Sequence, residues 1–156
     1  FPDGIEYEAD QRHAEIIIKQ MGLADSSRAV VSPGDRGSIA DRDKDIEELE
    51  GKDASLYRAM TARANYLSQD RSDIKYAVKE LSRHMAKPRI RDVQRLKRLA
   101  RYLLGCPRMV MKFAKQRKPH DLEGWSDSDW AGCFETRKST TGGMLKTDPT
   151  LSRDGV

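Results

Sequence analysis

Hydrophobic residues recur along the chain at intervals that predict four amphipathic helices. The first covers residues 10–23, where apolar side chains recur at steps of three and four: Ala14, Ile17, Ile18 and Met21. This spacing gathers them on one face of a helix. Asp10 offers a side-chain oxygen to the amides of the first turn, and Gly22 can adopt the left-handed conformation of a C-terminal cap.

Three further helical patterns lie between residues 53 and 107. Their apolar stripes are, in chain order, Tyr57, Met60, Ala64 and Leu67, then Ile74, Ala77, Val78, Leu81 and Met85, then Val93, Leu96, Leu99, Ala100, Leu103 and Leu104. Asp53 or Ser55 is expected to cap the first of these helices, and Pro88 prevents continuation of the second. Because the connections are short, we expect antiparallel neighbours in a small bundle.

Beyond residue 107 the pattern changes to a period of two, which predicts β-strands. Met109, Met111 and Phe113 alternate with other side chains, and residues 122–127 and 141–146 are the next strand candidates. A short strand is also predicted near the start of the chain, around Ile5 and Tyr7. The predicted fold class is therefore α+β, with a small bundle of about four helices followed by a short β-hairpin or three-strand piece.

The segment 24–52 interrupts these patterns. Its residues 41–50 are nearly all charged, with only Ile46 and Leu49 apolar. Such a segment cannot bury enough apolar surface to offset the entropy of ordering, so we predict a charged flexible linker. The predicted regions are an N-terminal region 1–23, the linker 24–52, a helical region 53–107, a strand region 108–147 and a disordered tail 148–156.

Composition narrows the class of protein. The chain has 156 residues and a formal net charge of +4, a mild basic bias whose location matters more than its size. No apolar run approaches the roughly 18 residues of a membrane span, so no membrane partner is expected. Cys106 and Cys133 lack metal-ligand spacing and are expected to be reduced thiols of an intracellular protein. A start at Phe1 rather than Met suggests a processed product, a recombinant segment or a piece of a longer chain.

Two segments near the C-terminus resemble a known family. Residues 125–132 (WSDSDWAG) and 137–143 (RKSTTGG) resemble the opening of the ribonuclease H domain in Pol polyproteins of copia-type retrotransposons. Upstream motifs resemble the region that joins reverse transcriptase to ribonuclease H: Leu56-Tyr57-Arg58, Asn65-Tyr66-Leu67, Arg71-Ser72-Asp73-Ile74 and residues 99–105. Residues 10–23 resemble the end of the reverse transcriptase. The resemblance covers most of the chain except roughly 24–52 and the last ten residues.

The resemblance implies a metal-binding role for Asp127. In the family, about four carboxylates from different elements hold two magnesium ions that cleave the RNA strand of a hybrid. Asp127 matches the first of these ligands, and Asp129 is a weaker candidate because alternate side chains share one face of a strand. The other ligands and the paired aspartates of the polymerase do not occur in this sequence. We therefore predict no catalysis and no cofactor for this chain alone, whereas magnesium is implied for the complete parent enzyme.

Basic side chains provide the candidate contacts to nucleic acid. Arg91, Arg95, Arg98 and Arg101 recur at helical steps and share a face, and such a row can neutralise backbone phosphates. Further candidates stand near the predicted strands: Lys115, Arg137 and Lys138. The expected partners are an RNA–DNA hybrid or another nucleic acid, and the remainder of the Pol polyprotein.

Two other interpretations stay open from the residues. The chain can be a non-catalytic helical interaction module or a decayed remnant, in which the arginine row is only a solvated helix face. It can also be an active nuclease whose missing carboxylates come from a partner chain. Trp130 is expected to pack in the core rather than to stack on bases, because aromatic residues in strand regions are more often buried.

Overall fold

The computed structural model describes residues 3–23, 27–34, 46–115, 121–133 and 136–148. The chain divides into two compact units, which we call the helical unit (Tyr7–Met111) and the strand unit (Phe1–Glu6 with Lys112–Val156). Residues 24–26 and 35–45 of the predicted linker and nearly all of the predicted tail lie outside the described residues.

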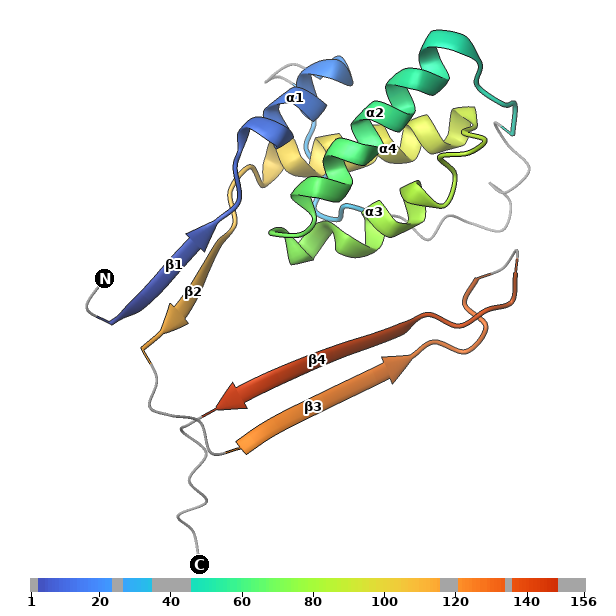
Figure 1. Cartoon of the computed structure of the whole chain (residues 1–156). Coiled ribbons are helices and arrows are strands. Elements are labelled where there is room, and N and C mark those ends of the chain that lie inside the picture. Colours follow the sequence, from blue (N-terminus) through green and yellow to red (C-terminus); the bar gives the residue numbers. More distant parts are fainter. Residues whose placement is uncertain (1–2, 24–26, 35–45, 116–120, 134–135, 149–156) are drawn as a thin grey trace, which may run out of the picture. The chain divides into compact units, whose positions relative to one another are not determined.

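The helical unit contains the four predicted helices (Figure 1). They are α1 (Arg12–Gln20), α2 (Gly51–Leu67), α3 (Lys75–Ser82) and α4 (Ile90–Gly105), with a 3-10 turn η2 (Ser72–Ile74) before α3. Helix α4 packs against each of the other three helices, and α2 also packs against α1 and α3. The predicted α+β fold class is confirmed, and α4 is the helix around which the unit is organised.

The predicted apolar stripes form one shared core. Its fully buried members are contributed by all four helices and include Ile17 from α1, Ala64 from α2, Val78 from α3, and Leu96, Leu99 and Leu103 from α4. Each large aliphatic side chain buried in this way contributes about 1.5–3 kcal/mol relative to exposure. The stripes therefore account for the mutual packing of the helices.

The ends of α1 follow the sequence prediction. The backbone amide of Arg12 donates to Oδ1 of Asp10 at 3.0 Å, and the guanidinium of Arg12 lowers the pKa of Asp10 to about 2. Gly22 has a φ of 67°, and the Leu23 amide reaches back to the Ile18 carbonyl at 3.2 Å. This left-handed cap requires glycine because a side chain would be strained at that φ.

The expected cap of α2 was wrong. The helix begins at Gly51, and its N-cap residue, Glu50, makes no side-chain capping hydrogen bond. Asp53 consequently lies in the first turn, where a carboxylate interacts favourably with the helix dipole. The hydroxyl of Ser55 donates to the Gly51 carbonyl at 3.0 Å instead of capping an amide.

A buried arginine joins η2 to the end of α4. The side chain of Arg71 is only 2% exposed. Its guanidinium donates to both carboxylate oxygens of Asp73 at 3.0 and 2.7 Å. It also donates to the carbonyls of Cys106 and Pro107 at 3.0 and 3.2 Å. The Tyr102 hydroxyl donates to Asp73 at 2.9 Å. We call these three side chains, Arg71, Asp73 and Tyr102, the Arg71 cluster.

The strands pair in two separate two-stranded sheets. Strand β1 (Gly4–Glu8) pairs with β2 (Val110–Ala114), and β3 (Asp121–Ser128) pairs in antiparallel register with β4 (Thr141–Asp148). Of the two predicted alternatives, the β-hairpin is present, formed by β3 and β4. Strand β2 does not join it as a third strand but pairs with β1. Among the described residues, no helix is both long and apolar enough to cross a membrane.

The buried position of Arg71 leads to a stability prediction. Replacing Arg71 by Met leaves the carbonyls of Cys106 and Pro107 without this donor and leaves Asp73 with only the Tyr102 hydroxyl, so we expect a loss of about 3–5 kcal/mol. Urea unfolding followed by helical circular dichroism measures it. The matched control is Arg12→Met, which breaks the exposed pair with Asp10 and should change stability by no more than about 1 kcal/mol. Equal losses in the two variants would contradict the prediction.

The Arg71 cluster also predicts a pH dependence. Burial raises the pKa of Asp73, but the hydrogen bonds from Arg71 and Tyr102 outweigh this effect and leave the pKa below its usual value. Because the pKa of Asp73 is lower in the folded than in the unfolded chain, its ionisation stabilises the fold at pH values above the unfolded-state pKa. This stabilisation is lost as the pH falls through the folded-state pKa. Stability should therefore decline below about pH 4. In Asp73→Asn this acid-linked decline should shrink, while stability at neutral pH should be lower; an unchanged acid profile would refute the assignment.

Candidate functional site

Asp127 lies on the β3–β4 hairpin of the strand unit. Its direct cross-strand partner is Gly142, and the neighbouring pair on the same face is Trp125 with Met144. Because Gly142 carries no side chain, the carboxylate has no cross-strand side-chain neighbour directly opposite it. Asp127 is exposed. It is thus accessible, as a metal ligand would need to be, but the hairpin alone does not enclose it.

Asp129 has a different environment. Strand β3 ends at Ser128, so the strand does not continue far enough to place Asp129 on the face of Asp127. Oδ1 of Asp129 accepts hydrogen bonds from the backbone amides of Thr140 and Gly132 at 2.7 and 3.3 Å. A Cβ atom at Gly132 would come too close to this carboxylate, so a side chain there would displace the Asp129 carboxylate. Asp129 organises the turn between the strands.

The expectation for Trp130 was wrong. It is 95% exposed, in the segment that follows Asp129. The prediction was based on the frequency with which such aromatic residues are buried, whereas β3 ends at Ser128 and the Trp130 indole is left exposed.

Among the described residues, Asp127 and Asp129 belong to no cluster of metal-ligating side chains. Among the described residues, no group of three or more His, Cys, Asp or Glu side chains could hold a metal ion. Asp129 also directs one oxygen toward backbone amides. A two-metal centre needs several convergent carboxylates, and the described residues bring no such group around Asp127.

Three predicted basic residues are exposed in the strand unit. They are Lys115, which follows β2, and Arg137 and Lys138, which lie in the turn before β4. The turn is fixed by hydrogen bonds from the Cys133 amide to the Lys138 carbonyl at 3.1 Å and from the Arg137 amide to the Cys133 carbonyl at 2.7 Å. Arg137 has a φ of 55°, which is uncommon for a residue with a side chain.

The arginine row of α4 surrounds a buried acid. Asp92 is fully buried, and its Oδ2 accepts the Arg89 amide at 3.0 Å, which caps the helix. Nη1 of Arg95 lies 3.5 Å and Nε of Arg91 lies 4.0 Å from Oδ1, while Nδ1 of His84 lies 3.9 Å from Oδ2. The side chain of Arg95 is 42% exposed and that of Arg91 only 13%. These cations thus neutralise Asp92, and Arg95 also faces solvent.

The C-terminal half of the row contacts a segment that sequence reasoning assigned to the linker. Nε of Arg101 donates to the Arg28 carbonyl at 2.9 Å, and Gly105 lies against Ala29. Arg28 and Ala29 therefore pack against the C-terminal part of α4. Arg98 lies between the two halves of the row and is partly exposed. The structure thus brings Arg91 and Arg95 together at Asp92 and places Arg101 against Arg28.

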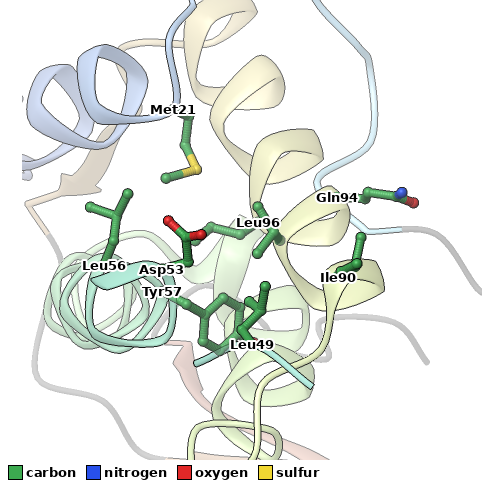
Figure 2. A pocket seen from close by; sticks show the side chains of 9 residues that line it. Met21, Leu49, Asp53, Leu56, Tyr57, Ile90, Gln94 and Leu96 are labelled. Carbon is green, nitrogen blue, oxygen red and sulfur yellow. The ribbon is translucent and has the colours of Figure 1, made fainter. Parts of the chain in front are cut away.

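A pocket in the helical unit was not anticipated from the sequence. Figure 2 shows it between the end of α1, the start of α2 and the N-terminal half of α4. Its cavity volume is about 210 Å³, and its lining is Met21, Leu49, Asp53, Leu56, Tyr57, Ile90, Val93, Gln94 and Leu96. The sequence offered one indication of the pocket, because Leu49 and Leu56 are apolar but belong to no predicted stripe. That these two residues line the same pocket depends on tertiary packing.

The comparisons with known proteins identify several relatives of this chain. The chain is 30% identical to an uncharacterized mitochondrial protein of Arabidopsis thaliana over 166 aligned residues, which cover 99% of this chain and 66% of that protein. It is 40% and 38% identical, over 90 residues each, to the retrovirus-related Pol polyproteins from transposons RE1 and RE2 of the same plant. No family model and no solved structure matches the chain.

The chain matches only a small part of each Pol polyprotein. The matched part is 58% of this chain but only 6% of each Pol polyprotein, so the activities of the whole polyproteins do not transfer directly. A second mitochondrial protein of Arabidopsis thaliana is 32% identical, and the aligned part covers 68% of its length. The chain therefore belongs to the family of retrotransposon-related sequences that comprises these Pol polyproteins and mitochondrial proteins.

Proposed function

We propose that this chain corresponds to the part of a copia-type retrotransposon Pol polyprotein that connects reverse transcriptase to ribonuclease H. In this proposal the helical unit binds the phosphate backbone of an RNA–DNA hybrid, and the chain by itself cleaves nothing. The proposed cellular setting is intracellular, where neither Cys106 nor Cys133 is expected to form a disulfide.

The charge distribution of α4 carries the proposal. The helix has five basic residues, Arg91, Arg95, Lys97, Arg98 and Arg101, and a single acid, Asp92. That acid is fully buried, so α4 presents only basic charged side chains to solvent. Counterion release from phosphates favours binding to such a surface without any contact to the bases. Arg28, exposed beside Arg101, extends it.

The absence of cleavage is supported by the acids of the strand unit. Asp127 is an exposed side chain on a two-stranded hairpin, and the described part of the chain brings no cluster of metal-binding side chains around it. One carboxylate holds magnesium weakly, and in-line phosphodiester cleavage needs the ion to be fixed on both reacting oxygens.

Binding should depend steeply on salt. We expect the full chain to bind a labelled RNA–DNA hybrid with an affinity that falls as salt rises. In Arg95→Gln/Arg98→Gln the log–log slope should decrease in magnitude by about 2, because each lost phosphate contact removes about 0.9. Fluorescence anisotropy at several salt concentrations measures the slope, and Arg95→Lys/Arg98→Lys should retain it.

A control double variant loses the same number of positive charges outside α4. It distinguishes an effect of the α4 surface from an effect of the net charge of the chain. Lys52→Gln/Lys75→Gln removes two exposed cations from α2 and α3 and should leave the slope near that of the unmodified chain. Circular dichroism confirms that each variant is folded. Absence of binding at low salt, or the same loss in both Gln doubles, would refute the proposed surface.

Cleavage is tested separately. With magnesium present, the purified chain should leave the RNA strand of a hybrid intact over hours. Gel analysis of end-labelled RNA provides the readout, with an unrelated ribonuclease H as positive control. Magnesium-dependent products that disappear in Asp127→Asn would overturn the inactive assignment and favour a nuclease completed by further carboxylates.

A further inference from the structure

The pocket of the helical unit has rigid walls. Residues 46–50 are held to the start of α4 by hydrogen bonds from the Leu49 amide to the Pro88 carbonyl at 2.8 Å and from the Ile90 amide to the Glu47 carbonyl at 3.1 Å. An isolated antiparallel β-bridge joins Glu48 to Arg89. On the opposite side, Tyr57 is 1% exposed, and its hydroxyl donates to the Leu81 carbonyl at 2.8 Å. Hydrogen bonds thus hold two sides of the pocket in place.

The size and lining of the pocket fit one large apolar side chain. Seven of its nine lining residues are apolar or aromatic, the exceptions being Asp53 and Gln94. An apolar cavity of about 150 Å³ accommodates a benzene molecule. The volume here, about 210 Å³, is sufficient for an aromatic ring but below the range of about 300–1,000 Å³ that is usual for whole small-molecule ligands.

The mouth of the pocket is acidic. Figure 2 shows the Asp53 carboxylate among the apolar lining, near Met21 and Tyr57. Asp53 is exposed and forms no ion pair or hydrogen bond with the described residues. Three further exposed acids, Glu47, Glu48 and Glu50, lie on the segment that contains Leu49, and Glu48 pairs with Lys87. An apolar ligand that carries a cation would thus gain electrostatic complementarity at the rim.

We propose that this pocket is a docking site for a basic amphipathic peptide segment of a partner protein, which inserts one aromatic side chain. A Lys or Arg about one helical turn from that aromatic residue pairs with Asp53. A buried aromatic anchor surrounded by charged rim contacts is the usual arrangement of an interface hot spot.

The test uses the full chain and a short helical alanine-based peptide with one Trp and a Lys one turn before and after it. Fluorescence anisotropy of the labelled peptide reports affinity, and NMR amide shifts report the site. We expect shifts at Leu49, Leu56 and Val93. Replacement of the peptide Trp by Ala should weaken binding at least about tenfold, since loss of a central anchor corresponds to about 1.4 kcal/mol or more.

Variants of the chain assign the pocket and its rim. Leu56→Trp fills the pocket and should abolish binding. Asp53→Lys should weaken binding of the Lys peptide several-fold and strengthen binding of a peptide with Glu in place of Lys. Glu15→Lys makes the same charge change at an exposed position of α1 and should alter the binding of neither peptide. Equal binding of the Trp and Ala peptides would show nonspecific attraction and overturn the proposal, as would shifts confined to residues outside the pocket.

Discussion

The hydrogen bonds of the buried Arg71 guanidinium fix the helical unit. A buried cation is tolerated only when its donors are satisfied, and Arg71 meets this requirement with Asp73 and the carbonyls of Cys106 and Pro107. Those carbonyls follow the last turn of α4, where the helix leaves backbone acceptors without intrahelical donors. One side chain thus ties the turn before α3 to the end of α4, and burial and the bond to Asp73 raise the pKa of Tyr102 to about 12.

The other end of α4 is held by the opposite charge. Asp92 caps the first turn and lies close to Arg91, Arg95 and His84. Burial and the charge of Asp92 raise the pKa of Tyr57, which keeps that hydroxyl protonated. The two buried charges fix α4 at both ends, and its remaining cations face outward. The same packing closes the walls of the apolar pocket on the neighbouring side of α4.

The helices and the hairpin could be predicted because their signals are local. Periodicity located all four helices, and Gly22 and Asp10 identified the ends of α1. The start of α2 was missed because Gly51 begins the helix with a positive φ, without a side-chain cap. The pairing of β1 with β2 joins segments about a hundred residues apart, which no local pattern reports. Resemblance identified Arg71-Ser72-Asp73, but only packing shows why the arginine and the aspartate are needed there.

The sequence named the individual residues of the candidate site but could not indicate their contacts with one another or with the rest of the helical unit. Sequence spacing placed Arg91, Arg95, Arg98 and Arg101 on one helix, yet the neutralisation of Asp92 and the contact with Arg28 depend on tertiary packing. The pocket likewise combines residues from three helices and the wall segment around Leu49. Local patterns specify elements, whereas buried charges and long-range contacts decide which side chains remain available for partners.

A double-mutant cycle on Arg71 and Asp73 tests the central claim most directly. Stabilities of the unmodified chain, Arg71→Met, Asp73→Leu and the double variant are compared by urea unfolding. If the two charges satisfy each other in the buried cluster, the double variant should be less destabilised than the sum of the single variants, with a coupling of about 1.5–3 kcal/mol. Additive losses would contradict the account, because they would mean that Arg71 and Asp73 stabilise the helical unit independently.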